Sequence, residues 1–168
     1  MGDRLYVLDS FAMLALLGGE PGSDRVSELL REAQEGTARL LMTWVNVGEV
    51  AYIVERRWGR ERTIRALGAL EATAIELLPV GRKLALAAAA IKARTPLAYA
   101  DAFAAALAAS EQAVLVTGDP GFRALGGALD IHWLPPEAQR TRMGADSPLR
   151  ARDTPPSKRL TRRKTCSR

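Results

Sequence analysis

Val7-Leu8-Asp9-Ser10 closes a short apolar run, residues 4–8, near the start of the chain. Short runs of branched and aromatic side chains are typical of buried strands, and an Asp-Ser pair directly behind one favours the start of a helix. Similar apolar segments recur at residues 40–43, 75–80, 113–117 and 130–134. Buried strands that alternate with helices predict an α/β fold in which a parallel sheet is flanked by helices on both faces.

The segments between these strands have the spacing and the end signals of helices. Ser23 or Asp24 is the expected cap of the second helix, and Gly36 ends it. Thr95 is the expected cap of the sixth helix, with Pro96 in the first turn, where a missing N–H costs nothing. The other expected helices cover residues 10–17, 24–34, 44–58, 61–72 and 82–93, and a helical turn covers residues 121–125.

The net charge of +5 conceals two different regions. Residues 137–168 hold ten of the 24 basic and three of the 19 acidic side chains, together with three prolines. Such a segment cannot bury enough apolar surface to offset the entropy of ordering, so we expect a disordered basic tail. It is either a nucleic-acid arm or an extension without function. Residues 1–136, with 14 basic and 16 acidic side chains, are expected to form a single domain.

Cysteine usage and apolar content favour a cytoplasmic protein. Cys166 is the only cysteine, which excludes an intrachain disulfide and a cysteine-based metal site. Asp9 interrupts the N-terminal apolar stretch, so a signal peptide is not expected. The longest apolar runs fall far short of the roughly 20 residues that span a bilayer, and we expect no membrane association.

Four acidic side chains stand in apolar surroundings. Asp9 and Asp119 each follow an apolar strand, so the carboxyl ends of a parallel sheet would bring them together. Glu49 is expected on an apolar helix face, and Asp101 interrupts the apolar segment 97–107. Buried carboxylates are costly and repel one another unless a cation compensates them. Mg²⁺ is a usual compensation, because it takes several oxygen ligands.

Each acid also has an ordinary structural interpretation. An Asp before a helix is a preferred N-cap, which suits Asp9, and Asp119 begins an Asp-Pro-Gly turn. Asp101 is expected beyond the first turn of its helix, where the helix dipole helps a carboxylate less. For Glu49 and Asp101, a Lys or Arg partner is the alternative to a metal ion.

In this order, the acidic motifs resemble those of the PIN-domain family of metal-dependent ribonucleases, and more narrowly the VapC-type toxins of bacterial toxin–antitoxin pairs. Val7-Leu8-Asp9-Ser10 is similar to the family's first-strand motif, and Asn46-Val47-Gly48-Glu49 to its second acidic motif. Ala98-Tyr99-Ala100-Asp101-Ala102 resembles the third motif, and Leu115-Val116-Thr117-Gly118-Asp119-Pro120-Gly121-Phe122 the fourth. The resemblance extends from residue 4 to about residue 135, and the tail has no counterpart.

The resemblance implies a ribonuclease that uses one or two Mg²⁺ or Mn²⁺ ions. Asp9 would be the central ligand, Glu49 and Asp101 would flank it, and Asp119 would bind directly or through water. The reaction that the resemblance implies is hydrolysis of an RNA phosphodiester, which leaves a 5′-phosphate and a 3′-hydroxyl. The bound ions would activate a water molecule and stabilise the departing oxygen.

Two polar side chains and an arginine-rich corner complete the predicted site. Thr117 has two interpretations: it orients Asp119 or a water molecule, or it is an ordinary buried strand residue. Asn46 adds a polar group one turn before Glu49. Arginine suits phosphate, and aromatic rings stack on unpaired bases. A helix–helix corner is therefore a candidate contact for RNA or, by the resemblance, for a small antitoxin, unless it is simply solvated. Its residues are Arg56, Arg57, Trp58 and Arg60. The resemblance also implies a homodimer.

Other functions remain open on the sequence. His132 is the only histidine, and the predicted domain has no cysteine, so acid–base and triad chemistry have little to draw on. A phosphoryl-transfer domain also has an Asp after its first strand. The phosphatase kind needs a second acid where Phe11 stands, and the receiver kind needs a lysine after the fourth strand, where none occurs before the tail. A non-catalytic PIN-like scaffold is the third interpretation, which the presence of all four acids disfavours.

Overall fold

The computed structural model describes residues 4–135, and the predicted basic tail, residues 137–168, lies outside the described residues. None of the helices in the described part is long and apolar enough to cross a membrane. The elements in chain order are β1 (Arg4–Leu8), α1 (Ser10–Gly18), α2 (Ser23–Gln34), β2 (Ala38–Thr43), α3 (Trp44–Trp58), α4 (Arg60–Glu71), β3 (Ile75–Leu78), α5 (Arg82–Arg94), α6 (Tyr99–Glu111), β4 (Val114–Thr117), the 3₁₀ helix η1 (Pro120–Leu125) and β5 (Ile131–Trp133).

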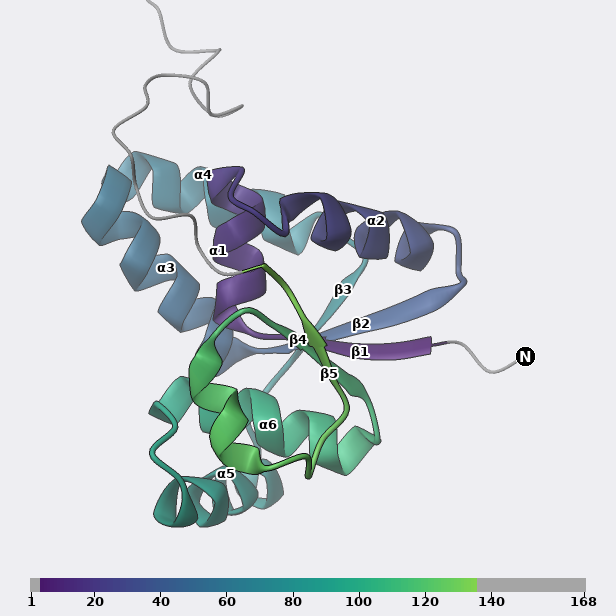
Figure 1. Ribbon diagram of the computed structural model, residues 1–168. Coiled ribbons are helices and arrows are strands. Elements are labelled where there is room, and N and C mark those ends of the chain that lie inside the picture. The colour runs from purple at the N-terminus through teal and green to yellow at the C-terminus, as the bar shows by residue number, and fades with distance from the viewer. Residues whose placement is uncertain (1–3, 136–168) are drawn as a thin grey trace, which may run out of the picture.

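All five strands run parallel in one sheet, in the order β3-β2-β1-β4-β5. From β1 the chain builds outward to β2 and β3, then crosses back and forms β4 on the other side of β1 (Figure 1). The winding direction therefore reverses between β1 and β4, and open α/β sheets bind ligands outside the carboxyl ends of the strands at such a point. Receiver domains have the strand order 2-1-3-4-5, which differs from the order 3-2-1-4-5 of this sheet, so the receiver interpretation is wrong.

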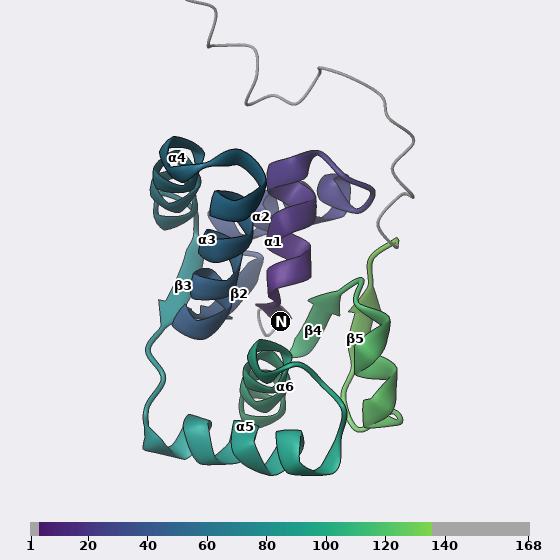
Figure 2. The same cartoon turned by 90° about the vertical axis from the view of Figure 1, so that its left-hand side faces the viewer.

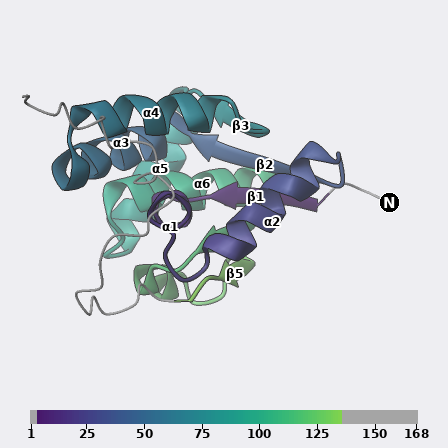
Figure 3. The same cartoon turned by 90° about the horizontal axis from the view of Figure 1, so that it is seen from above.

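Helices cover both faces of the sheet, as the sequence predicts. α1 to α4 lie on one side, and α5 and α6 lie on the other (Figures 1 and 2). α2 lies obliquely over the sheet (Figure 3) and is in contact with β2. α3 contacts both α1 and α6, so it joins the two helical layers at the carboxyl end of the strands.

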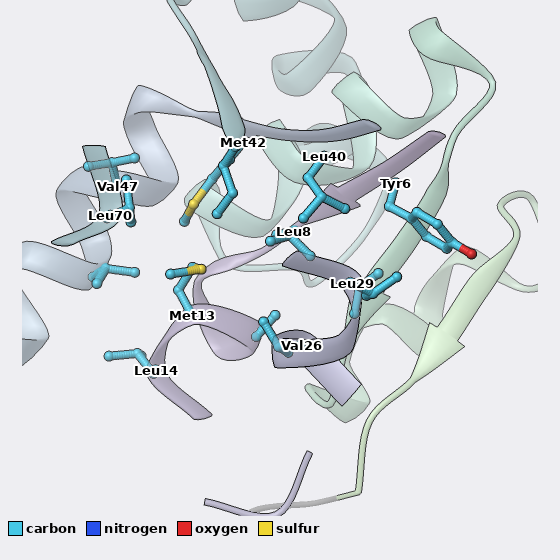
Figure 4. Packing of buried hydrophobic residues seen from close by; sticks show 14 of the residues in the cluster. Tyr6, Leu8, Met13, Leu14, Val26, Leu29, Leu40, Met42, Val47 and Leu70 are labelled. Carbon is cyan, nitrogen blue, oxygen red and sulfur yellow. The ribbon is translucent and has the colours of Figure 1, made fainter. Parts of the chain in front are cut away.

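The central strand β1 buries side chains on both of its faces. Tyr6 and Leu8 pack into the core beneath α1 and α2, and Val7 packs into a second core against α6. Figure 4 shows the first core, in which Met13 of α1 and Val26 of α2 lie close to the sheet. A strand that is buried on both faces has a continuous apolar sequence, which is why residues 4–8 predict it so clearly.

Several elements begin or end at residues other than those predicted. β2 begins at Ala38, two residues before the predicted start, and β3 ends at Leu78, two residues before the predicted end. The N-cap of α2 is Gly22, not Ser23 or Asp24. Asp24 instead lies in the first turn of α2, where its charge is favourable to the helix dipole.

The start of α6 is the largest difference from the sequence prediction. Thr95 ends α5, where its hydroxyl donates to the Ile91 carbonyl oxygen at 2.9 Å, and α6 begins only at Tyr99. A proline favours an extended conformation in the residue before it, and Leu97 is buried in the core against α6. The prediction that Thr95 caps α6 is therefore wrong. As a consequence, Asp101 lies within the first turn of α6 and not beyond it.

Candidate active site

The four predicted acids come from four elements that meet at one end of the sheet. Asp9 directly follows β1, and Asp119 lies two residues after β4. Asp101 lies in the first turn of α6, and Glu49 lies in the second turn of α3. The starts of α1, α3 and α6 come together in the centre of Figure 2. The fold thus gathers the four acids at the reversal point between β1 and β4.

Asp9 is almost completely buried, with 1% of its surface exposed. Its Oδ1 accepts the Ala12 backbone N–H at 2.9 Å and caps α1, and its Oδ2 accepts the Thr117 hydroxyl at 2.5 Å. The pKa of Asp9 is raised to about 8, chiefly by burial; the hydrogen bonds from Thr117 and Ala12 oppose this rise, and the charges of Asp101 and Asp119 add to it. At neutral pH the protonated form of Asp9 is therefore favoured, and a nearby cation would favour the charged form.

Asp101 is also buried, although less completely, with 8% of its surface exposed. Burial raises its pKa to about 7, and the charges of Asp119 and Glu49 raise it as well. The side chain of Asp101 reaches back to Ala98, the N-cap residue of α6, and accepts its backbone N–H, as the acid of a capping box does. This hydrogen bond favours the charged carboxylate and so lowers the pKa of Asp101. The raised pKa shows that burial and the neighbouring acids outweigh this bond.

Lys92 is a candidate for the basic partner that the structural interpretation of Asp101 requires. Its positive charge lowers the pKa of Asp101, but it is the weakest of the five influences on that pKa. The ammonium group donates to the Leu97 carbonyl oxygen at 2.5 Å, and no ion pair joins Lys92 to Asp101 within residues 4–135. Lys92 therefore compensates the charge of Asp101 only in part.

Thr117 connects two of the acids. Its hydroxyl is fully buried, donates to Asp9 and accepts the backbone N–H of Asp119 at 2.9 Å. Asp119 is half-buried, and its Oδ1 accepts the Gly121 N–H at 2.7 Å, which forms the turn predicted there. Thr117 thus orients Asp9 through its carboxylate and Asp119 through its backbone.

Glu49 lies at the edge of the site. It is half-buried, and Tyr52, one turn further along α3, is 51% exposed. The apolar face of α3 on which Glu49 was predicted is only partly buried: Val45 and Ile53 pack against the core, and Tyr52 is exposed. The charge of Glu49 nevertheless raises the pKa of Asp101, so the two carboxylates are close enough to interact. The buried face of α3 consists of Asn46, Val47, Val50 and Val54.

Asn46 is completely buried, and its side chain bonds to three other elements. Its Oδ1 accepts the Thr43 hydroxyl at 2.6 Å, and its Nδ2 donates to Ser10 Oγ at 3.3 Å and to the Ala100 carbonyl oxygen at 3.1 Å. Ser10 and Thr43 were not predicted as site residues. The only sequence signal for them is their position directly after Asp9 and directly before α3, where polar caps are common.

The arginine-rich corner lies where α3 meets α4. Arg57 pairs with Glu20 at 3.7 Å, and its guanidinium lies 6.0 Å from the centre of the Trp58 ring. Trp58 is half-buried and packs against the core beneath α1 to α4, whereas Arg56 and Arg60 are exposed. A shallow hollow on α3 is lined by Tyr52, Ile53, Arg56 and Arg57.

The four acids suit a divalent cation, because each offers carboxylate oxygens and because the pKa values of Asp9 and Asp101 are raised to about 8 and 7. No three acidic, histidine or cysteine side chains of residues 4–135 stand close enough to surround one ion. Side-chain rotation is therefore needed for them to close on it. His132 lies on β5, where burial and the charge of Arg25 lower its pKa, and it adds no ligand to the acids.

A family model described as "PIN domain" matches residues 6–128. The chain belongs to the PIN-domain family. No curated protein matches it. The matched segment of this PIN domain contains all four acids, so the family assignment covers the whole candidate site.

Solved structures of VapBC proteins share the fold of this PIN domain. A DNA-bound VapBC2 structure from Rickettsia felis has a TM-score of 0.61 at 15% identity, covering 78% of this chain and 99% of that chain. A DNA-bound VapBC structure from Salmonella typhimurium has a TM-score of 0.59 at 19% identity, covering 77% and 97%. VapC20 of Mycobacterium tuberculosis, described as a Sarcin-Ricin loop cleaving toxin, has a TM-score of 0.54 at 18% identity, covering 72% and 95%.

Proposed function

We propose that this PIN domain is a ribonuclease that depends on Mg²⁺ or Mn²⁺ and hydrolyses RNA phosphodiester bonds. The observation that carries the proposal is the burial of Asp9 and Asp101 beside further acids, which raises their pKa values to about 8 and 7. A scaffold without a cation would gain nothing from this repulsion. A divalent cation would remove the protons from both groups and convert the repulsion into ligand binding.

Asp9, Glu49, Asp101 and Asp119 would hold the cation, which supplies an activated water and stabilises the charge on the departing oxygen. Thr117 would hold Asp9 in place, because its hydroxyl donates to Oδ2 of that residue. Asp9 retains a further lone pair on each oxygen beyond its two hydrogen bonds, so capping α1 and binding a cation are compatible.

We further propose that the protein is the toxin of a VapBC-type pair, that it forms a homodimer, and that a small antitoxin neutralises it. The VapBC structures that share the fold support this, since their descriptions name toxin–antitoxin proteins. The exposed Arg56 and Arg60 offer charge to RNA phosphates or to an acidic antitoxin surface. Arg57 and Trp58 already contact one another, so they would contribute as a preformed pair.

The test is cleavage of a labelled single-stranded or loop RNA by the full chain, with Mg²⁺, with Mn²⁺ and with EDTA. We expect cleavage that leaves 3′-hydroxyl ends with either metal and none in EDTA. Asp101→Asn should abolish cleavage. Asp24→Asn, which removes an exposed acid of α2 with the same change of charge, should cut as wild type does.

Two results would contradict the proposal. Cleavage by metal-free protein in EDTA would exclude the metal mechanism, and 2′,3′-cyclic phosphate ends would indicate attack by the RNA's own 2′-hydroxyl. A third comparison tests Asp101 alone: if Asp101→Asn lowers the melting temperature in EDTA strongly while Asp24→Asn does not, Asp101 is a structural partner and not a ligand. We expect Asp101→Asn to melt at the wild-type temperature or above, because it relieves repulsion with Asp119 and Glu49.

A further inference from the structure

Asn46 connects the starts of three helices through a single carboxamide. It belongs to the first turn of α3, donates to Ser10 at the start of α1, and donates to the Ala100 carbonyl oxygen at the start of α6. Its two partners are 36 and 54 residues away in the sequence. The Ser10 hydroxyl in turn donates to the backbone carbonyl oxygen of Asn46 at 3.2 Å, so each of α1 and α3 donates a hydrogen bond to the other.

The three joined helix starts carry three of the four acids. Ser10 directly follows Asp9, Ala100 directly precedes Asp101, and Glu49 lies one turn after Asn46. A shift of one helix start relative to another would therefore change the separation of two carboxylates. No other side-chain hydrogen bond among residues 4–135 links α3 to α6.

We propose that Asn46 is a positioning residue, which fixes the spacing of Asp9, Glu49 and Asp101 and thereby sets the affinity of the acids for a divalent cation. This inference rests on the proposed metal-dependent function. Both amide hydrogens and the amide oxygen of Asn46 are already bonded, so it acts through the backbone of its neighbours and not as a ligand.

The physical reason is that the acids repel one another whenever the cation is absent. Hydrogen bonds in a completely buried place are hard to exchange for water, so the Asn46 bonds resist the separation of α1 from α6. Residues that orient metal ligands from behind typically contribute about 10- to 100-fold to metal affinity.

A purely structural role for Asn46 makes a different prediction, and Thr63 provides the matched control. Thr63 is also buried, at 6% exposed, and its hydroxyl donates to the Gly59 carbonyl oxygen at 3.2 Å. That bond lies at the corner where Gly59 ends α3 and precedes α4, and it joins neither α1 nor α6. Thr63→Ala should therefore reduce stability without changing the spacing of the acids.

The experiment measures Mn²⁺ binding to the full chain by electron paramagnetic resonance, with no RNA present. We expect Asn46→Ala to weaken Mn²⁺ binding by about 10- to 100-fold, and Thr63→Ala to leave it at the wild-type value. Ser10→Ala is the milder second variant, because it removes the bonds to α1 and leaves the bond to Ala100. It should weaken Mn²⁺ binding by a smaller factor than Asn46→Ala.

Equal Mn²⁺ affinity in Asn46→Ala, Ser10→Ala and Thr63→Ala would overturn the positioning role. If the wild type itself binds no Mn²⁺, the proposed function fails. The positioning role is then tested separately, by the backbone amide chemical shifts of the metal-free variants. Asn46→Ala should shift the backbone amides of Asp9, Glu49 and Asp101, and Thr63→Ala should not. Unshifted amides at these positions would show that Asn46 does not hold the helix starts.

Discussion

Asp9→Asn should remove a dependence of stability on pH from the metal-free protein. The pKa of Asp9 is about 8 in the folded protein, against 3.8 for an ordinary Asp. Between these values the folded protein holds a proton that the unfolded chain has released. Folding therefore binds a proton, and stability falls as the pH rises through this window. Asn carries no proton to release, so the variant lacks this contribution.

The magnitude follows from the width of the window. One proton bound on folding lowers the free energy of unfolding by about 1.4 kcal/mol for each pH unit. From about pH 5 to about pH 7 the unfolding free energy should fall by roughly 3 kcal/mol because of Asp9. The protein and water around the buried carboxylate can rearrange when it ionises, so we expect a smaller fall of about 1–2 kcal/mol. For a chain of this size, that difference corresponds to roughly 2–8 °C in melting temperature. Asn is as good an N-cap as Asp, so α1 keeps its cap.

The assay is urea unfolding of wild type and Asp9→Asn in EDTA, at several pH values from about 5 to about 8. The difference in unfolding free energy should grow in favour of the variant as the pH rises. Asp101, whose pKa is raised to about 7, also makes the unfolding free energy fall as the pH rises, and it is present in both proteins. The unfolding free energy of the variant should therefore still decline with pH, but less steeply than that of the wild type. Parallel curves would refute the reasoning, because they would show that Asp9 titrates alike in both states.

Two further substitutions and a deletion test other parts of the protein. A side chain at Gly118 would stand 2.2 Å from the Phe11 ring, so Gly118→Ala should destabilise the fold by roughly 1–3 kcal/mol in a thermal melt. Gly68→Ala, in an open place on α4, should instead stabilise it by about 0.5–1 kcal/mol. Deletion of residues 137–168 should leave the cleavage rate unchanged. If the tail binds RNA phosphates, its deletion should flatten the plot of log affinity against log salt concentration. The slope should change by roughly 0.7 for each phosphate that the tail neutralises. An unchanged slope would show that the tail is a passive extension.

The strands and the position of two acids were predictable because they depend on local pattern. Asp9 and Asp119 follow apolar runs, and the carboxyl ends of parallel strands share one edge of the sheet. The strand order was not predictable, since an apolar run does not determine on which side of β1 the chain returns. That side is set by how α5 and α6 pack on the sheet, which is a contact between distant segments.

The start of α6 shows how a distant contact overrides a local signal. Thr95 and Pro96 have the features of a helix start, but Leu97 is buried and its carbonyl oxygen accepts a bond from Lys92. The segment is thereby held extended, and α6 begins where Asp101 can reach back to the Ala98 N–H. The same limit applies to Asn46, whose polarity was visible in the sequence but whose partners on α1 and α6 were not.

The capping role and the proposed catalytic role of the acids are complementary. Asp9, Asp101 and Asp119 each accept a backbone N–H at the start of a helix, where the helix dipole favours negative charge. These bonds hold the carboxylates in the site against their mutual repulsion, before any cation compensates them. Replacement by Asn keeps such a bond and removes the charge, whereas replacement by Ala removes both. At Asp101 and Asp119 Asn therefore separates the chemistry from the folding, and a loss of activity in the Asn variant is attributable to the missing charge. At Asp9 the substitution also replaces the Oδ2 that accepts the Thr117 hydroxyl, so a loss of activity there has two causes.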